Sequence, residues 1–252
     1  MTFPAKLFIG VDMFDRQEFK RQAKAQLKGH WTTPVLITLV TGIVLSIVTI
    51  PMALYYSAYE EVYNYQQAYE NIENASLIPL IIFPIVILGI GVFVIAEAKY
   101  YLVFTARQGN APFSVFLESF NLWWRGFRAC LWYSLWTYLW SLLFVIPGIV
   151  KALAYSQTFF IVAENPHISV RKAMRLSIAM TKGYKGDLFV LGLSFIGWAL
   201  VSTLTLYIGY LWLTPYINVT RVNAYHFLKQ SAFDRGVLKP EDFGTSGFIG
   251  NV

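Results

Sequence analysis

Long apolar stretches, separated by short polar segments, dominate the chain. Residues 31–98, 130–150 and 188–220 contain no Lys or Arg and are dense in Ile, Leu, Val, Phe and Trp. A helix rises 1.5 Å per residue, so about 20 apolar residues cross a hydrocarbon core of roughly 30 Å. The pattern therefore predicts an all-α, polytopic membrane helix bundle.

The two later apolar stretches are each too long for one crossing, and the basic residues decide how they fold. If residues 129–163 crossed once, the basic residues after them would face the opposite side from Arg125 and Arg128. A hairpin broken at residues 146–148 keeps them together, because Pro147 lacks a donor and Gly148 is permissive. Residues 206–209 offer a similar break. We predict six spans as three hairpins, at about 34–56, 77–104, 129–146, 148–164, 187–205 and 209–228.

Charge sets the orientation. Seventeen of the 20 Lys and Arg residues fall in the segments that this topology places on one side, and the other three lie within spans. The opposite loop, residues 57–76, carries four Glu and no basic residue. Basic residues favour the cytoplasmic side. Both termini are therefore expected in the cytoplasm, with residues 1–230 as a single integral-membrane domain and 231–252 as a flexible cytoplasmic tail.

The content of charged residues indicates which binding partners to expect. Charged residues make up 13% of the chain, against about 25% in soluble domains. The formal net charge is +6, but the basic residues sit beside apolar spans. Anionic lipid headgroups on the inner side are therefore the expected counter-charge, and nucleic acid is not expected as a partner.

Three inside segments share one layout. Each reads as an amphipathic helix that ends in a basic-Gly-aromatic triplet, and the triplets are 28–30, 125–127 and 182–184. The expected helical faces are Phe19, Ala23 and Leu27; Phe113, Phe116, Leu117, Phe120 and Trp124; and Ala173, Met174, Ser177 and Ile178. An internal repeat of helix plus hairpin explains the layout. A surface helix that feeds a span also tends to end in Gly near a basic residue, so this alternative stays open.

Polar residues within the predicted spans are candidates for function, because they are costly in a bilayer. The candidates are Glu97, Lys151, Gln157 and Asn218. In the repeat alignment Lys151 lies one helical turn further out than Glu97, a gap that a Lys side chain can bridge, so the two can form an ion pair. Gln157 and Asn218 align with each other at one depth. One interpretation is a solute or proton path. The other is ordinary hydrogen bonding between helices, at about 0.6 kcal/mol each.

The outside loop and its approach form a second candidate surface. Tyr59 and Tyr63 share a helical face beside Glu60 and Glu61. Such a surface could bind a cationic peptide through charge and cation–π contacts. The alternative is an aromatic belt that extends the first span.

Signatures of catalysis are missing from the sequence. It contains no HExxH, GxSxG or Walker motif. The three His residues lack metal-ligand spacing, and Cys130 is the single cysteine. We expect no enzyme activity, no catalytic residue, no metal and no cofactor.

Several motifs together resemble a bacterial integral-membrane family catalogued as a domain of unknown function, number nine-seven-five. They are residues 144–152, 154–156, 163–166, 169–183 and 193–198, with Pro215-Tyr216 downstream and 23–31 near the start. The likeness reaches to about Tyr225, and the Tyr- and Glu-rich outside loop departs from the family's pattern. The resemblance implies a multi-span protein of a bacterial plasma membrane, with no activity to carry over.

Two functions follow from these observations. The first is a non-enzymatic protein that acts through protein partners or lipids at the plasma membrane. The alternative is a small-solute or ion transporter or channel, with a path near Glu97, Lys151, Gln157 and Asn218.

Overall fold

The computed structural model describes residues 13–62 and 78–243, and every regular element in these ranges is a helix. The α-helices are α1 (Arg16–Leu27), α2 (Thr32–Val62), α3 (Ile78–Ala106), α4 (Phe113–Glu118), α5 (Trp123–Leu143), α6 (Val145–Tyr155), α7 (Thr158–Glu164), α8 (Val170–Met180), α9 (Lys185–Leu193), α10 (Ile196–Leu204) and α11 (Tyr210–Asp234). Two 3-10 turns, η3 (Ser119–Leu122) and η4 (Pro240–Phe243), complete the described part.

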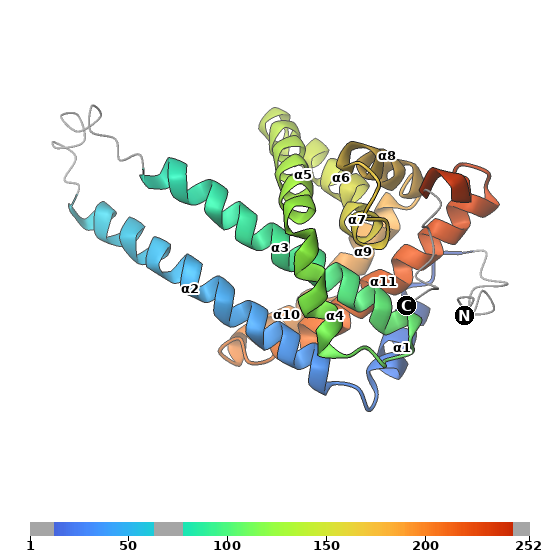
Figure 1. Cartoon of the computed structure of the whole chain (residues 1–252), viewed down its shortest axis with the longest axis horizontal. Helices are drawn as coiled ribbons and strands as arrows, with labels where there is room; N and C mark the ends of the chain where they lie inside the picture. Colours follow the sequence, from blue (N-terminus) through green and yellow to red (C-terminus); the bar gives the residue numbers. More distant parts are fainter. Residues whose placement is uncertain (1–12, 63–77, 244–252) are drawn as a thin grey trace.

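The helices gather at one end of the molecule. Figure 1 shows α2 and α3 side by side, extending away from the end where α1, α7, α8 and the later part of α11 meet. That end holds the core, because α1 packs on α11, and α7 packs on both α3 and α8. Its largest fully buried side chains include Phe19, Tyr100, Phe104 and Tyr225.

Three segments of the described chain are long and apolar enough to cross a membrane. They are Gly89–Ala106 in α3, Val145–Glu164 across α6 and α7, and Lys185–Leu204 across α9 and α10. A fourth exists if α1 and the start of α2, bent by 100°, count as one. These segments fit a membrane protein and overlap the first, second, fourth and fifth predicted spans.

The third and sixth predicted spans lie in α5 and α11, which are not among these segments. Helix α5 is rich in Trp, Tyr and Ser, whose polar atoms lower its hydropathy. Helix α11 carries polar and charged residues along its length, including Asn218, Arg221 and Lys229. The arrangement of six spans in three hairpins therefore stays a prediction.

The break between α5 and α6 lies earlier than predicted. Phe144 is extended, whereas Pro147 and Gly148 belong to the first turns of α6. Proline fits there because the first N–H groups of a helix have no partner within the helix. The second predicted break is in place, since the chain reverses between α10 and α11 through Leu206 and Tyr207, which both have positive φ.

Two glycines allow the helices of these reversals to touch. A Cβ on Gly209 would lie 2.8 Å from Ser202 Cα, and a Cβ on Gly148 would collide with Ser141 in the same way. In both reversals the serine precedes the glycine by seven residues. Helix α5 approaches α3 just as closely, because a Cβ on Gly91 would lie 2.8 Å from the carbonyl oxygen of Gly126.

Two predicted spans are broken near their middle. The span predicted at 148–164 divides into α6 and α7 at Ser156 and Gln157, and the span predicted at 187–205 divides into α9 and α10 at Ser194 and Phe195. At both breaks a side chain from another helix donates a hydrogen bond to a backbone carbonyl. Ser177 Oγ donates to the Ala154 carbonyl over 2.7 Å, and Lys20 Nζ donates to the Ser194 carbonyl over 3.2 Å.

Two of the three predicted inside helices, α1 and α8, begin at a residue whose side chain caps the helix. Asp15 caps α1 by accepting from the amides of Gln17 and Glu18, and Phe19, Ala23 and Leu27 are fully buried. Ser169 caps α8 by accepting from the Lys172 amide.

Two predicted faces need correction. Helix α4 has only six residues before η3 turns the chain, so Leu117 and Trp124 are about half exposed instead of sharing the face of buried Phe116. Ile178 also lies outside the buried face of α8 and is 37% exposed.

The described part of the predicted tail is packed. Helix α11 continues through Asp234, and η4 returns Phe243 to the core at 1% exposure, where its ring meets Phe233. The expectation of a flexible tail from residue 231 is therefore wrong up to Phe243. Residues 244–252 lie outside the described residues.

Candidate intramembrane polar site

Glu97 and Asn218 meet between α3 and α11. Asn218 Nδ2 donates to Glu97 Oε2 over 3.2 Å. Both were candidate polar residues of the predicted spans, and the packing of α11 on α3 brings the two side chains into contact. Among the described residues Glu97 has no cationic partner.

Two hydroxyl groups complete this polar site. Thr41 of α2 lies beside the Glu97 carboxylate, and Tyr101, one turn further along α3, lies close to both Asn218 and Thr38. The hydroxyls of Thr41 and Tyr101 are buried, and neither has a partner of ordinary hydrogen-bond geometry in the described part of the chain. The site therefore collects a carboxylate, an amide and two hydroxyls from three helices. Such a set can hold a proton, or coordinate a small cation through oxygen.

Lys151 and Gln157 do not join this site. Lys151 Nζ lies 4.4 Å from the centre of the Trp140 ring, and forms no ion pair with Glu97. Helix α6 packs on α5, α8 and α9, which places Lys151 on the α5 side. A cation over an indole ring is a stable arrangement that needs no carboxylate.

Gln157 supports the break between α6 and α7. Its backbone N–H donates to Ser177 Oγ over 3.2 Å, and its side-chain Nε2 donates to Ser156 Oγ over 2.8 Å. The Thr181 hydroxyl also reaches this region, since it lies 3.4 Å from the Ala154 carbonyl oxygen. These contacts favour a structural role for Gln157, because its backbone N–H bonds to α8 and its side-chain amide bonds to the adjacent Ser156.

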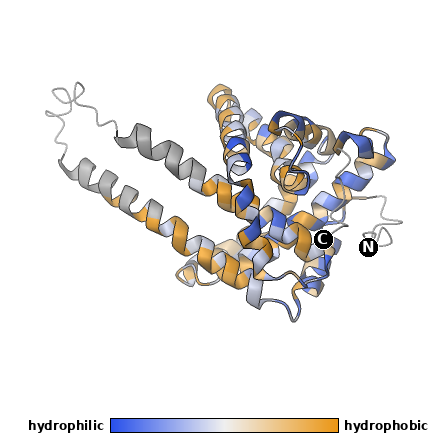
Figure 2. Ribbon diagram, viewed as in Figure 1, coloured by the Kyte–Doolittle hydropathy of each residue, from blue (hydrophilic) through white to orange (hydrophobic). Residues whose placement is uncertain are grey.

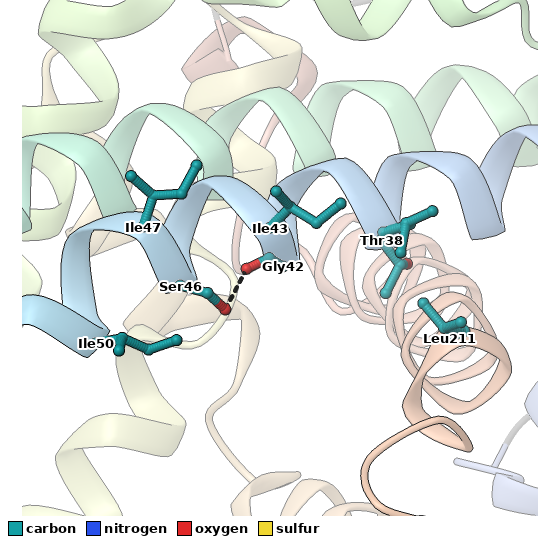
Figure 3. Close-up of a pocket in the computed structure, with 8 residues that line it drawn as sticks. Thr38, Gly42, Ile43, Ser46, Ile47, Ile50 and Leu211 are labelled. Carbon is teal, nitrogen blue, oxygen red and sulfur yellow. Dashed lines mark hydrogen bonds between the residues drawn. The ribbon is translucent and has the colours of Figure 1, made fainter.

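An apolar groove of about 570 Å³ runs along α2 on the side of Leu211 (Figure 3). Its polar side chains are Thr38 and Ser46, and both hydroxyls bond to their own helix. Thr38 donates to the Pro34 carbonyl over 3.1 Å, and Ser46 donates to the Gly42 carbonyl over 2.8 Å. The lining therefore offers little for a hydrated solute to bind.

The structure also shows a buried ionic contact that the sequence prediction missed. Glu164, at the end of α7, accepts from Tyr225 Oη over 2.5 Å and from Lys229 Nζ over 2.7 Å. The Lys229 and Glu164 side chains are 12% and 8% exposed. The four-residue spacing of Tyr225 and Lys229 puts both on one face of α11, which is the signal that could have indicated a shared acidic partner. The contact fastens α7 to α11.

The candidate surface of Tyr59, Glu60, Glu61 and Tyr63 cannot be placed in this way. Tyr63 lies outside the described residues, and the other three belong to the last turns of α2, where the description covers the backbone. No group of His, Cys, Asp and Glu suited to a metal ion occurs within residues 13–62 and 78–243.

Comparison with known proteins identifies one relationship. No curated protein and no solved structure matches the chain. Residues 130–232, from Cys130 within α5 to Ala232 near the end of α11, match the family described as "Protein of unknown function (DUF975)". The matched segment contains Asn218, the Glu164 contact and both helix reversals with a close Ser–Gly approach. The resemblance expected from the sequence is therefore confirmed over residues 130–232, and the matched family has no known function.

Proposed function

We propose that the chain is a multi-pass protein of a bacterial plasma membrane that acts without catalysis, through inner-leaflet lipids and membrane protein partners. The observation that carries the proposal is the separation of charge from apolar surface. Figure 2 shows hydrophilic residues gathered around α1, α8 and the end of α11, whereas hydrophobic residues run along α2. Exposed apolar side chains at the far ends of other helices, such as Leu143 and Leu204, require a lipid environment.

The six-span topology with both termini in the cytoplasm is part of this proposal. Three or four segments support it by length and apolarity, and the reversals at Phe144 and at residues 205–209 return the chain toward the core. Helices α1 and α8 then lie at the inner surface, with Phe19 and Met174 toward the core and Arg16 and Arg175 outward.

Single-cysteine labelling tests the topology. Cys130 is the single cysteine, so Cys130→Ser provides the background. In that background we would introduce Val145→Cys and Leu206→Cys, whose native side chains are 71% and 84% exposed, and compare them with Lys182→Cys. An impermeant maleimide should label the first two in intact cells and Lys182→Cys only after lysis. Labelling of all three from one side would contradict six spans.

Affinity purification from native membranes tests the mode of action. The proposal expects co-purification of a stoichiometric membrane protein or of enriched anionic lipid. A preparation with neither, but with saturable solute uptake in vesicles, would favour transport instead.

A second candidate function rests on Glu97. A carboxylate between apolar helices, beside two hydroxyls that lack ordinary hydrogen-bond partners among the described residues, suits binding of a proton or small cation. Glu97→Gln keeps an oxygen that can accept from Asn218 but removes the charge. Loss of proton- or cation-driven uptake in vesicles, with unchanged thermal stability, would support this function. Unchanged uptake, or no uptake in either protein, would contradict it.

A further inference from the structure

A second groove lies where α5, α6 and α8 meet. It has a volume of about 620 Å³, and its walls include Trp132 and Trp136 from α5, Tyr155 from α6, and Arg171, Arg175 and Ile178 from α8. The two indole rings are nearly parallel, at 15° and 6.4 Å between centres. The groove is therefore aromatic on one side and cationic on the other.

The two arginines have no acidic partner in the part of the chain that the structure describes. Neither Arg171 nor Arg175 forms an ion pair within the described residues, and α8 itself contains no Asp or Glu. Their four-residue spacing places both on one face of α8. The Arg171 guanidinium lies 4.6 Å from the centre of the Trp132 ring, which holds it at the groove. Two guanidinium groups that line one groove suit the oxygens of a phosphate, which arginine binds in bidentate fashion.

The surroundings of the groove indicate which phosphate compound it suits. Beyond Trp136, α5 exposes apolar side chains, with Leu142 and Leu143 at 65% and 63% exposure. An acyl chain can follow this surface, whereas a soluble anion would leave the aromatic wall unused. Tryptophan and arginine at the same level are typical of the boundary between headgroups and hydrocarbon.

We infer that Arg171, Arg175, Trp132 and Trp136 form a binding site for one anionic phospholipid of the inner leaflet. The two guanidinium groups bind its phosphate, and the indole rings line the glycerol and the first part of an acyl chain. This inference deepens the proposed function and rests on its membrane location, since it names the lipid class and the place of contact.

Native mass spectrometry of the full chain, purified from vesicles of phosphatidylcholine with one-fifth phosphatidylglycerol, tests the site. We expect the protein to retain one phosphatidylglycerol in preference to phosphatidylcholine. The variant Arg171→Gln/Arg175→Gln should lower that preference about tenfold. The matched control, Lys172→Gln/Lys182→Gln, removes the same charge from in and near α8 but leaves the groove intact, and should retain the preference.

Three further results decide between explanations. Equal losses in the arginine and lysine variants would overturn the site in favour of general surface charge. Displacement of the lipid by soluble glycerol phosphate at similar concentration would overturn the lipid as occupant. If Arg171→Gln/Arg175→Gln does not fold, Trp136→Ala, which leaves all charges in place, should still weaken retention, and undiminished retention would overturn the site.

The site and the proposed function can fail separately. A protein that inserts into vesicles and shows no preference between the two lipids overturns the site alone. A protein that does not insert into vesicles overturns the proposed function and the site together.

Discussion

The backbone of Gly126 in α5 occupies the space that a side chain at Gly91 in α3 would need. A Cβ on Gly91 would lie 2.8 Å from the Gly126 carbonyl oxygen and 3.0 Å from Phe127 Cα. These atoms are backbone and cannot rotate away. Small residues at such crossings let two helices approach closely, which is how helices in membranes gain packing energy.

Gly91→Ala should therefore destabilise the fold, by about 1–3 kcal/mol, because α3 and α5 must separate. Thermal unfolding in detergent measures this loss. Gly89→Ala is the matched control, since a Cβ there meets no atom within 4 Å. An equal effect of both substitutions would contradict the packing argument.

Loss of the buried ion pair between Lys229 and Glu164 should lower the free energy of unfolding more than Gly91→Ala does. Lys229→Met leaves Glu164 with Tyr225 as its remaining partner among the contacts described above, and breaking a buried pair costs about 3–5 kcal/mol. The exposed pair of Arg21 and Glu18 provides the control, because Arg21→Met should cost at most about 1 kcal/mol. Chemical unfolding would measure both. Glu164→Gln combined with Lys229→Met should recover part of the loss, and a purely additive loss would contradict coupling of the two residues.

The hydroxyl of Ser177 should be needed at the break between α6 and α7. It donates to the Ala154 carbonyl and accepts from the Gln157 amide, so Ser177→Ala leaves two buried backbone groups without this partner. The expected cost is about 1–3 kcal/mol. Ser46→Ala is the control, because that hydroxyl bonds to its own helix on an exposed face. Faster limited proteolysis between Tyr155 and Thr158 in Ser177→Ala would locate the effect.

Acid should weaken α1 slightly. Hydrogen bonds from Arg21, then from Gln22, hold the pKa of Glu18 below its ordinary value of 4.5. Because the folded pKa is lowered, the stabilisation is present above about pH 4.5 and is lost as the pH falls through the folded pKa. The pair is largely exposed, so we expect less than about 1 kcal/mol. Unfolding followed between pH 3 and pH 6 should show a smaller acid loss in Glu18→Gln than in the native chain.

The sequence predicted the all-α class correctly, because the length of an apolar stretch and the position of charged residues can be seen in each segment without knowing its neighbours in space. Helices α1 and α8 contain the amphipathic faces that the sequence predicts, and the reversal near Gly209 lies where a break was expected. The sequence predicted that Pro147 would end a helix. Proline is also favoured in the first turn of a helix, and here Pro147 lies in the first turn of α6, so the chain reverses earlier, at Phe144.

The candidate site was predicted in part, since contacts between distant helices depend on which faces pack. Glu97 and Asn218 meet, but Lys151 turns to Trp140 because α6 packs on α5. Thr41 and Tyr101 were missed, as a hydroxyl within an apolar helix leaves no local sign of its neighbour. Phe243 was assigned to a flexible tail, because one buried ring in a Gly-rich segment shows no periodicity.

The matched contacts of Gly148 with Ser141 and of Gly209 with Ser202 have a mechanical consequence. Each contact holds two helices together close to the turn that joins them, so we expect the pair to resist bending there. We expect the helices to bend at Ser156 and at Ser194 instead, because one helix ends and the next begins at each of these positions. The break at Ser156 lies beside α8 and the break at Ser194 lies beside α1. We therefore expect a movement of α8 or α1 to tilt the adjoining helix pair as a unit.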